Sequence, residues 1–170
     1  MMGFGIDLAH VPEFQAALDD PKSFFFDRYF TANEASYCRG RPASEQARHF
    51  AVRYAAREAL VKAMDGGRLH QPPAFTFDYR EAEVRRDDHG RPFLFATGAV
   101  RDYLAVRGVQ RIHLSLTHTG DYALAGVMLE SKGTRNTNGD DTITGKSALD
   151  AMLGAAVTGI GKPTQLPTIR

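Results

Sequence analysis

Two acidic residues and one lysine are the first side chains of this sequence that could do chemistry. Asp7 stands between Ile6 and Leu8, and an ionised carboxylate in such an apolar segment needs a partner, of which a hard cation is one. Glu58 and Lys62 are four residues apart, so a helix would place them on one face. Two alternatives stay open: Asp7 could cap a helix or form a salt bridge, and Glu58 with Lys62 could be an exposed pair worth about 0.2–0.5 kcal/mol.

Basic residues gather in the same part of the chain. Between residues 39 and 62, six basic residues stand against two acidic ones, which is a local charge of +4. This is the one basic stripe of the sequence, and phosphate is its natural ligand. The alternative is a solvated helix face. The six residues are Arg39, Arg41, Arg48, Arg53, Arg57 and Lys62.

A third candidate lies near residue 115. Ser115 and Thr117 alternate with leucines on the polar side of an expected strand, and His118 ends that strand before a tight turn. Such a row could hold an anionic or nucleotide group, whereas the alternative is a structural histidine that bonds a loop carbonyl. The sequence has no Gly-rich P-loop.

A long helix must carry Glu58 and Lys62. It is expected from about Ser44 to Met64, a stretch rich in Ala, Arg and Glu that two glycines then end. Phe50, Tyr54 and Val61 recur at spacings of four and seven, which predicts one buried stripe.

The remaining elements follow from alternation, caps and turns. Thr31 and Glu34 have the spacing of a capping box, which predicts a short helix from about Ala32. Phe75, Phe77 and Tyr79 alternate with polar residues, and with residues 93–95 they predict an antiparallel hairpin. The pattern predicts an α+β fold, in which a mainly antiparallel sheet wraps against one long helix. The other expected elements are a strand over 3–8, helices over 12–20 and 98–107, and a second hairpin over 112–117 and 122–129.

Composition divides the chain near residue 130. The 11 Phe, the 6 Tyr, all 6 His and the only Cys lie between Phe4 and Tyr122, while residues 131–170 hold seven Thr and six Gly. We therefore expect a domain over residues 1–130 and a largely disordered extension over residues 131–170.

Charge and cysteine content narrow the classes of function. The chain has 21 basic and 20 acidic residues, so its net charge of +1 predicts neither nucleic-acid nor membrane binding. No apolar run approaches the roughly 18 residues of a membrane span. A single cysteine, Cys38, makes no internal disulfide, and the first residues carry no secretion signal. A cytoplasmic protein is expected.

Taken together, these segments resemble the 4′-phosphopantetheinyl transferase family, and most closely its small holo-[acyl-carrier-protein] synthase group. The resemblance rests on four motifs and covers residues 3–130. The motifs are Gly5-Ile6-Asp7-Leu8, the segment over 28–34 with its Phe-Thr-x-x-Glu, the helix over 50–63, and Ser115-Leu116-Thr117-His118. The helix motif is the most specific of them.

The resemblance implies a reaction. The 4′-phosphopantetheine group would pass from coenzyme A to a serine of an apo acyl carrier protein or carrier domain, with magnesium required and adenosine 3′,5′-bisphosphate released. Asp7 and Glu58 would be the magnesium ligands, and Lys62 would contact the reacting phosphates. Glu58, directly or through a metal-bound water, would accept the serine proton. His118, with the strand that carries Ser115 and Thr117, would lie against the nucleotide part of coenzyme A. Arg53 would be a further candidate for phosphate contact.

The resemblance also implies an assembly, because small members of the family are homotrimers with active sites between subunits. The alternative to an enzyme is a catalytically silent module of the same fold that binds coenzyme A or a nucleotide.

The sequence departs from the family pattern in the region that would bind the carrier protein. Residues 12–30 hold four acids and two bases where the family has a basic docking surface. We therefore expect docking to shift to Arg39, Arg41 and Arg48, or the carrier to be less acidic.

Overall fold

The computed structural model describes residues 3–68 and 70–131. The expected extension, from residue 132 on, lies outside the described residues. The elements are β1 (Gly3–His10), α1 (Val11–Asp19), α2 (Phe25–Tyr29), α3 (Ala32–Arg39), α4 (Ala43–Asp65), the short 3-10 helix η1 (Tyr79–Glu81), β2 (Ala82–Arg86), β3 (Pro92–Ala96), α5 (Gly98–Val106), β4 (Val109–Thr119) and β5 (Tyr122–Ser131).

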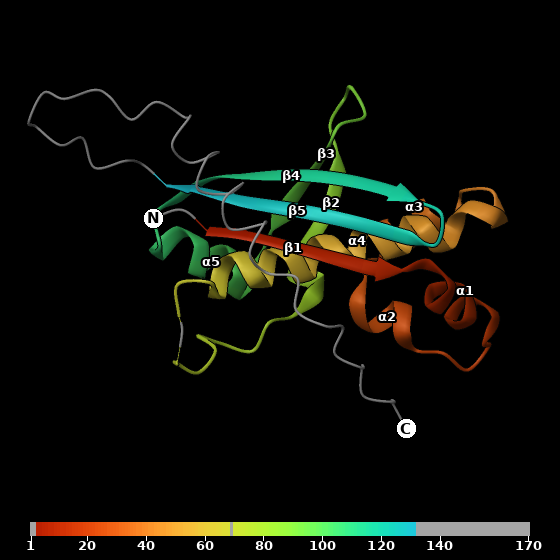
Figure 1. Ribbon diagram of the computed structural model, residues 1–170, viewed down its shortest axis with the longest axis horizontal. Coiled ribbons are helices and arrows are strands. Elements are labelled where there is room, and N and C mark those ends of the chain that lie inside the picture. Colours follow the sequence, from red (N-terminus) through yellow and green to blue (C-terminus); the bar gives the residue numbers. More distant parts are fainter. Residues whose placement is uncertain (1–2, 69, 132–170) are drawn as a thin grey trace, which may run out of the picture. The chain divides into compact units, whose positions relative to one another are not determined.

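Three of the strands form one antiparallel sheet in the order β1-β5-β4, with helix α4 lying along it (Figure 1). Strands β4 and β5 are the hairpin that the turn after Thr119 predicts. Strand β1, from the start of the chain, pairs antiparallel with β5. The α+β class with antiparallel pairing is therefore confirmed. Strand β5 is central, so β1 is an edge strand and carries Asp7 at the side of the sheet.

Strand β1 and helix α4 touch backbone to backbone. A Cβ atom added at Gly5 would overlap the carbonyl oxygen of Ala59, and one added at Gly3 would overlap that of Ala63. Only glycine on the strand allows this approach. The contact sets Asp7, two residues further along the same face of β1, close to the helix.

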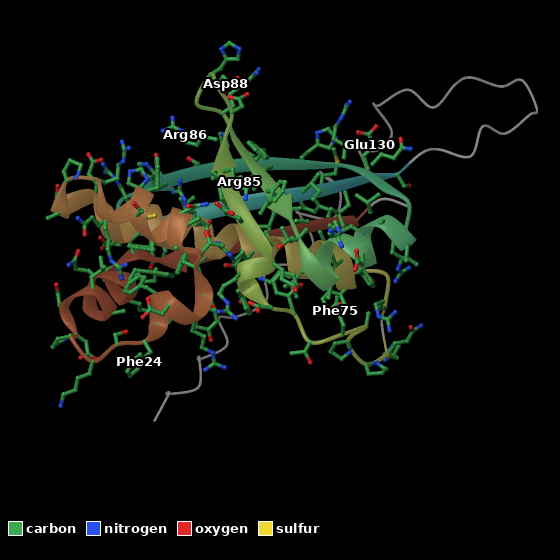
Figure 2. All side chains as sticks on the ribbon, turned by 180° about the vertical axis from the view of Figure 1, so that it is seen from behind. Phe24, Phe75, Arg85, Arg86, Asp88 and Glu130 are labelled. Carbon is green, nitrogen blue, oxygen red and sulfur yellow. The ribbon has the colours of Figure 1, made fainter. Side chains whose placement is uncertain are left out.

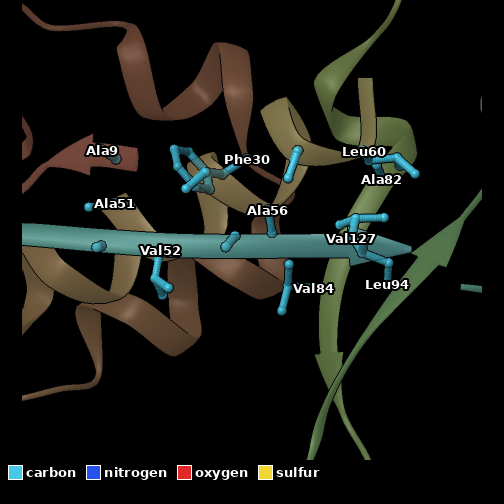
Figure 3. Close-up of a cluster of buried hydrophobic side chains, with 14 of the residues drawn as sticks. Ala9, Phe30, Ala51, Val52, Ala56, Leu60, Ala82, Val84, Leu94 and Val127 are labelled. Carbon is cyan, nitrogen blue, oxygen red and sulfur yellow. The ribbon is translucent and has the colours of Figure 1, made fainter. Parts of the chain in front are cut away.

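Helix α4 is buried on most of its sides. Its buried surface is wider than the single stripe expected from the sequence. Phe50 is fully buried as expected, but Tyr54 and Val61 are only half-buried. Alanines occupy the other buried sides of the helix. Their small side chains let the three-stranded sheet, strands β2 and β3, and the N-terminal helices all pack against it. Figure 3 shows Ala56 and Leu60 among the core side chains of β5 and of the two-stranded sheet that β2 and β3 form.

The β2–β3 hairpin corrects one prediction. Its first strand is Ala82–Arg86 and not the aromatic segment, which runs as a loop into η1. Alternation misled here because Phe75 packs on Tyr103, with ring centroids 5.3 Å apart, and Phe77 packs at the same distance on Tyr79. The hairpin tip projects away from the sheet, with Arg86 on its stem (Figure 2).

The predicted capping box is confirmed. The Glu34 amide donates to Thr31 Oγ1, and the Thr31 amide donates to Glu34 Oε2, both at 3.3 Å. The same carboxylate accepts a hydrogen bond from the amide of Val84 at 2.9 Å and one from Arg57. Glu34 therefore joins α3, α4 and β2. Among the described residues, no helix is long and apolar enough to cross a membrane.

Candidate active site

Asp7 and Lys62 meet where β1 crosses α4. Lys62 Nζ donates to Asp7 Oδ1 at 2.7 Å and to the carbonyl oxygen of Ile6 at 3.1 Å. The Asp7 side chain is 16% exposed and that of Lys62 is 52% exposed. An ion pair with one exposed partner is weak, so both groups are available to a ligand that brings its own charges.

Glu58 lies one helical turn before Lys62 and has a different partner. Tyr79 Oη donates to Glu58 Oε1 at 2.5 Å. Burial, together with this hydrogen-bonded carboxylate, raises the pKa of Tyr79. Burial and the Glu58 carboxylate also raise the pKa of Tyr54, and the Asp7 carboxylate adds to that rise.

The acidic site, meaning Asp7, Glu58 and Lys62, has the donor set for a hard cation. Among the described residues, no group of three or more His, Cys, Asp or Glu side chains could hold a metal ion. Mg²⁺ does not need such a group, because it is usually bound through one or two carboxylates together with waters and substrate phosphates. The residues present therefore fit magnesium as the partner of a phosphate substrate.

The basic stripe does not exist as one surface. Arg57 is fully buried and pairs with the buried Glu34, and its Nε donates to the carbonyl oxygen of Tyr79 at 2.7 Å. Burial lowers the pKa of Arg57, against the opposing effect of Glu34. A guanidinium paired in this way is structural, so the interpretation of Arg57 as part of a phosphate stripe is wrong.

A second group of basic residues forms an open groove between α3, α4, β4 and the hairpin. The guanidinium carbons of Arg53, Arg41 and Arg86 lie 4.3, 4.5 and 5.7 Å from the centre of the Tyr37 ring. We call this the arginine groove, and its lining includes Arg41, His49, Arg53, Arg86, Thr117 and His118.

The arginine groove is suited to an anion. The Nε atoms of Arg41 and Arg53 are buried and have no hydrogen-bond acceptor among the described residues. Burial and the charges of Arg53, Arg41 and Arg48 lower the pKa of His49, against the opposing effect of Glu45. A buried donor without an acceptor costs free energy that an anionic ligand would recover.

The structure divides the candidate residues from the sequence between these two places. Asp7, Glu58 and Lys62 come together, while Arg53, Thr117 and His118 line the arginine groove. Ser115 lies in neither. It pairs with Gly126 on the sheet face opposite α4, the face that also carries Ile6.

Four further residues were not assigned to a site from the sequence. Tyr79 reaches Glu58 from a loop, and Tyr37, His49 and Arg86 line the arginine groove. Only tertiary packing brings them there, and no spacing along the chain indicated it.

An acidic site with a lysine, together with a separate arginine groove, is typical of enzymes that act on phosphate esters. Residues 3–127 match the family model of the 4′-phosphopantetheinyl transferase superfamily, and the chain belongs to that family. The resemblance seen in the sequence is thus confirmed.

Known relatives agree with this assignment. The chain is 42% identical over 132 residues to the holo-[acyl-carrier-protein] synthase of Mycobacterium tuberculosis strain H37Rv, a match that covers 77% of this chain and 98% of the relative. It is 40% identical over the same length to the synthase of Mycobacterium ulcerans, with the same coverage.

Solved structures give the same picture. A complex described as "Chronobacterium ammoniagenes ACPS-CoA complex" superposes with a TM-score of 0.66 at 32% identity, covering 78% of this chain and 98% of that one. The acyl carrier protein synthase of Mycobacterium tuberculosis superposes with a TM-score of 0.60 at 41% identity, covering 76% and 96%.

Proposed function

We propose that this chain is an enzyme that transfers 4′-phosphopantetheine from coenzyme A to a serine of an apo acyl carrier protein, releasing adenosine 3′,5′-bisphosphate. The observation that carries the proposal is the 42% identity to holo-[acyl-carrier-protein] synthases over 98% of their length. A similar structure that holds coenzyme A supports coenzyme A as the substrate. The cytoplasmic location expected from the sequence stays a prediction.

The acidic site is where we place the reacting phosphates. Asp7 and Glu58 would hold Mg²⁺, which when bound neutralises part of the negative charge of the pyrophosphate. Lys62, released from Asp7 once a cation competes for that carboxylate, would place its ammonium group on the same phosphates. The exposure of Lys62 and the weak ion pair that it makes support this exchange.

Glu58 is our candidate for the base. The serine oxygen of the carrier forms a bond to the phosphorus that bears pantetheine, and the bond from that phosphorus to the bisphosphate breaks. The serine proton would pass to Glu58. Lys62 stabilises the negative charge that gathers on the leaving phosphate.

The arginine groove would bind the nucleotide part of coenzyme A. Arg53 supplies a guanidinium whose Nε lacks an acceptor, and Thr117 with His118 supplies further polar groups. Ser115 was expected to share this role. It lies on the same sheet face as Thr117 but does not line the groove, so we assign it that role only toward a ligand held by a neighbouring chain.

A homotrimer with active sites between subunits would join the two places. The sheet face opposite α4 carries Phe4, Ile6 and Leu8, which are 49, 47 and 57% exposed, and Leu124 and Met128 lie opposite them on β5. An open apolar sheet face of this kind is typical of an interface between protein chains. Packing through it could bring the groove of one chain to the acidic site of the next.

The carrier must approach an acidic helix. Helix α1 has Glu13 in its first turn and ends at Asp19. The sequence offered Arg39, Arg41 and Arg48 as an alternative docking site. Of these, only Arg39 is an exposed residue. Arg41 lines the arginine groove, and Arg48 pairs with a glutamate at 2.6 Å. We therefore favour a carrier that is less acidic than those that the family's basic helix fits.

We also propose that residues 1–130 suffice for the reaction and that residues 131–170 are dispensable. The relatives support this division, since 132 residues of this chain span 98% of their length. A chain truncated after Glu130 should keep the transfer rate of the full chain, and loss of transfer would contradict the division.

The deciding experiment is a mass measurement. The full chain is incubated with coenzyme A, Mg²⁺ and a panel of apo carrier proteins of graded acidity, and each carrier is examined for the added phosphopantetheine mass. A carrier that gains this mass supports the enzyme. If coenzyme A binds but no carrier gains mass, the alternative of a silent binding module holds instead.

A further inference from the structure

Tyr79 brings a hydroxyl group to the acidic site from outside β1 and α4. Its Oη lies 2.5 Å from Glu58 Oε1. Such a length is typical of a hydroxyl that donates to an ionised carboxylate, which is among the stronger hydrogen bonds in proteins. The contact joins residues that are 21 positions apart in the chain.

The Tyr79 ring is held on several sides. It stacks on Tyr54 with centroids 5.8 Å apart and planes 7° apart, and the Tyr29 ring meets its edge at 4.9 Å. Its backbone carbonyl accepts the hydrogen bond from Arg57, which the buried Glu34 fixes in turn. The hydroxyl therefore has a well-defined position from which to act on Glu58.

We propose that Tyr79 is a positioning residue that holds the Glu58 carboxylate in its working orientation. A glutamate side chain without a fixed partner would have to lose rotational freedom each time it bound a cation or accepted a proton, and the Tyr79 hydroxyl reduces that loss. The inference rests on the proposed function, because it is there that Glu58 has these two roles. In this role Tyr79 acts through Glu58 and not on the phosphates.

The test compares two tyrosine-to-phenylalanine variants of the full chain. Tyr79→Phe removes the hydroxyl and keeps the stacked ring. Tyr29→Phe is the matched control, because it removes a hydroxyl from the same aromatic cluster. In the described part of the chain, Tyr29 makes no hydrogen bond to Glu58. Affinity for Mn²⁺, as a probe of the magnesium site, is measured by electron paramagnetic resonance with coenzyme A present and no carrier.

We expect Tyr79→Phe to weaken Mn²⁺ binding by about tenfold, the usual effect of losing a partner that orients a metal ligand. In the transfer assay kcat should fall by a similar factor, while KM for the carrier stays unchanged. Tyr29→Phe should match the wild type in both measurements. Equal Mn²⁺ affinity of Tyr79→Phe and wild type would overturn the inference.

A second variant guards against a general loss of structure. Glu58→Asp withdraws the carboxylate from the hydroxyl, so adding Tyr79→Phe to it should cause no further loss of Mn²⁺ affinity. A further tenfold loss would mean that Tyr79 acts other than through Glu58. If the wild type transfers nothing to any carrier, the proposed function fails by itself, and the Mn²⁺ comparison still decides the role of Tyr79; a wild type that binds no Mn²⁺ overturns it.

Discussion

The acidic site and the arginine groove use the same helix in opposite ways. In the acidic site, the two carboxylates already hold donors from their own chain, Lys62 on Asp7 and Tyr79 on Glu58. In the groove, three guanidinium groups lie close to the Tyr37 ring, and the buried Nε atoms of Arg41 and Arg53 have no acceptor within the described part of the chain. The groove therefore has hydrogen-bond donors that an anion could pair in the free protein. In the acidic site, the carboxylates are already paired within the chain until a cation and phosphates compete for them.

This contrast predicts an order of events. A ligand with several phosphates gains most from the groove, so binding begins there, and the acidic site acts on what the groove holds. The two regions should respond differently to mutation: changes in the acidic site should affect the rate of transfer, and changes in the groove should affect the affinity for coenzyme A.

The largest effect is expected at the acidic site. Asp7→Ala should lower kcat for carrier modification by on the order of 10³-fold, because the charge that would hold magnesium is lost. Unfolding by urea should change little, since the ion pair with Lys62 is partly exposed. Asp88→Ala, at the hairpin tip (Figure 2), is the matched control and should leave kcat unchanged. A kcat for Asp7→Ala within threefold of the control, roughly the scatter of a surface change, would remove Asp7 from the reaction.

Mixing two defective chains tests whether the regions meet between subunits. An Asp7→Ala chain co-assembled with an Arg53→Ala/His118→Ala chain should regain activity at low coenzyme A, because about a quarter of the interfaces of a random mixture pair two intact regions. The control is Asp7→Ala mixed with Glu58→Ala. This mixture should regain no activity, because both changes disable the acidic site. Failure of the first mixture to regain activity, with mixed oligomers confirmed by mass, would place both regions in one chain.

A smaller effect is expected from one groove residue. His118→Ala should raise KM for coenzyme A by about fivefold, the worth of one ordinary hydrogen bond, with kcat nearly unchanged. His113→Ala serves as the control on the same strand, because His113 pairs with Glu130 and does not line the groove. If His118→Ala lowered kcat and left KM for coenzyme A unchanged, the groove would act in the transfer step and not in binding coenzyme A.

The smallest effect concerns acid stability. Burial and neighbouring arginines lower the pKa of His49, so below the ordinary value of 6.5 the unfolded chain takes up a proton that the folded chain does not. The free energy of unfolding should therefore fall as the pH drops from 7.5 to 5.5, by up to about 1 kcal/mol from this residue. His49→Gln should flatten that slope in urea titrations. An unchanged slope would show that His49 takes up the proton equally in both states.

The sequence predicted those parts of the molecule that local chemistry determines. The Thr31–Glu34 capping box forms as expected because both of its hydrogen bonds lie within four residues. Asp7, Glu58 and Lys62 were chosen from strand and helix periodicity and from the family resemblance, and the fold brings them together. Their roles stay predictions.

The parts that escaped prediction depend on distant contacts. Strand β2 carries charged residues, and nothing local shows that Glu83 is buried and paired with Arg85 at 2.9 Å. Arg57 looked like part of a basic surface, yet Glu34, 23 residues away, binds it inside the core. Tyr79 looked like part of a strand, and its hydroxyl reaches Glu58 only because that strand is a loop.

The contact of Gly5 with the Ala59 carbonyl limits how this enzyme can change its sequence. Where two side chains touch, a larger residue on one side can be accommodated by a smaller one on the other. Here the atom in the way belongs to the backbone of α4, so no substitution in the helix makes room for a Cβ on the strand. Mutations can change the aromatic packing of the N-terminal helices. The spacing between Asp7 and helix α4 can change only if strand β1 itself moves.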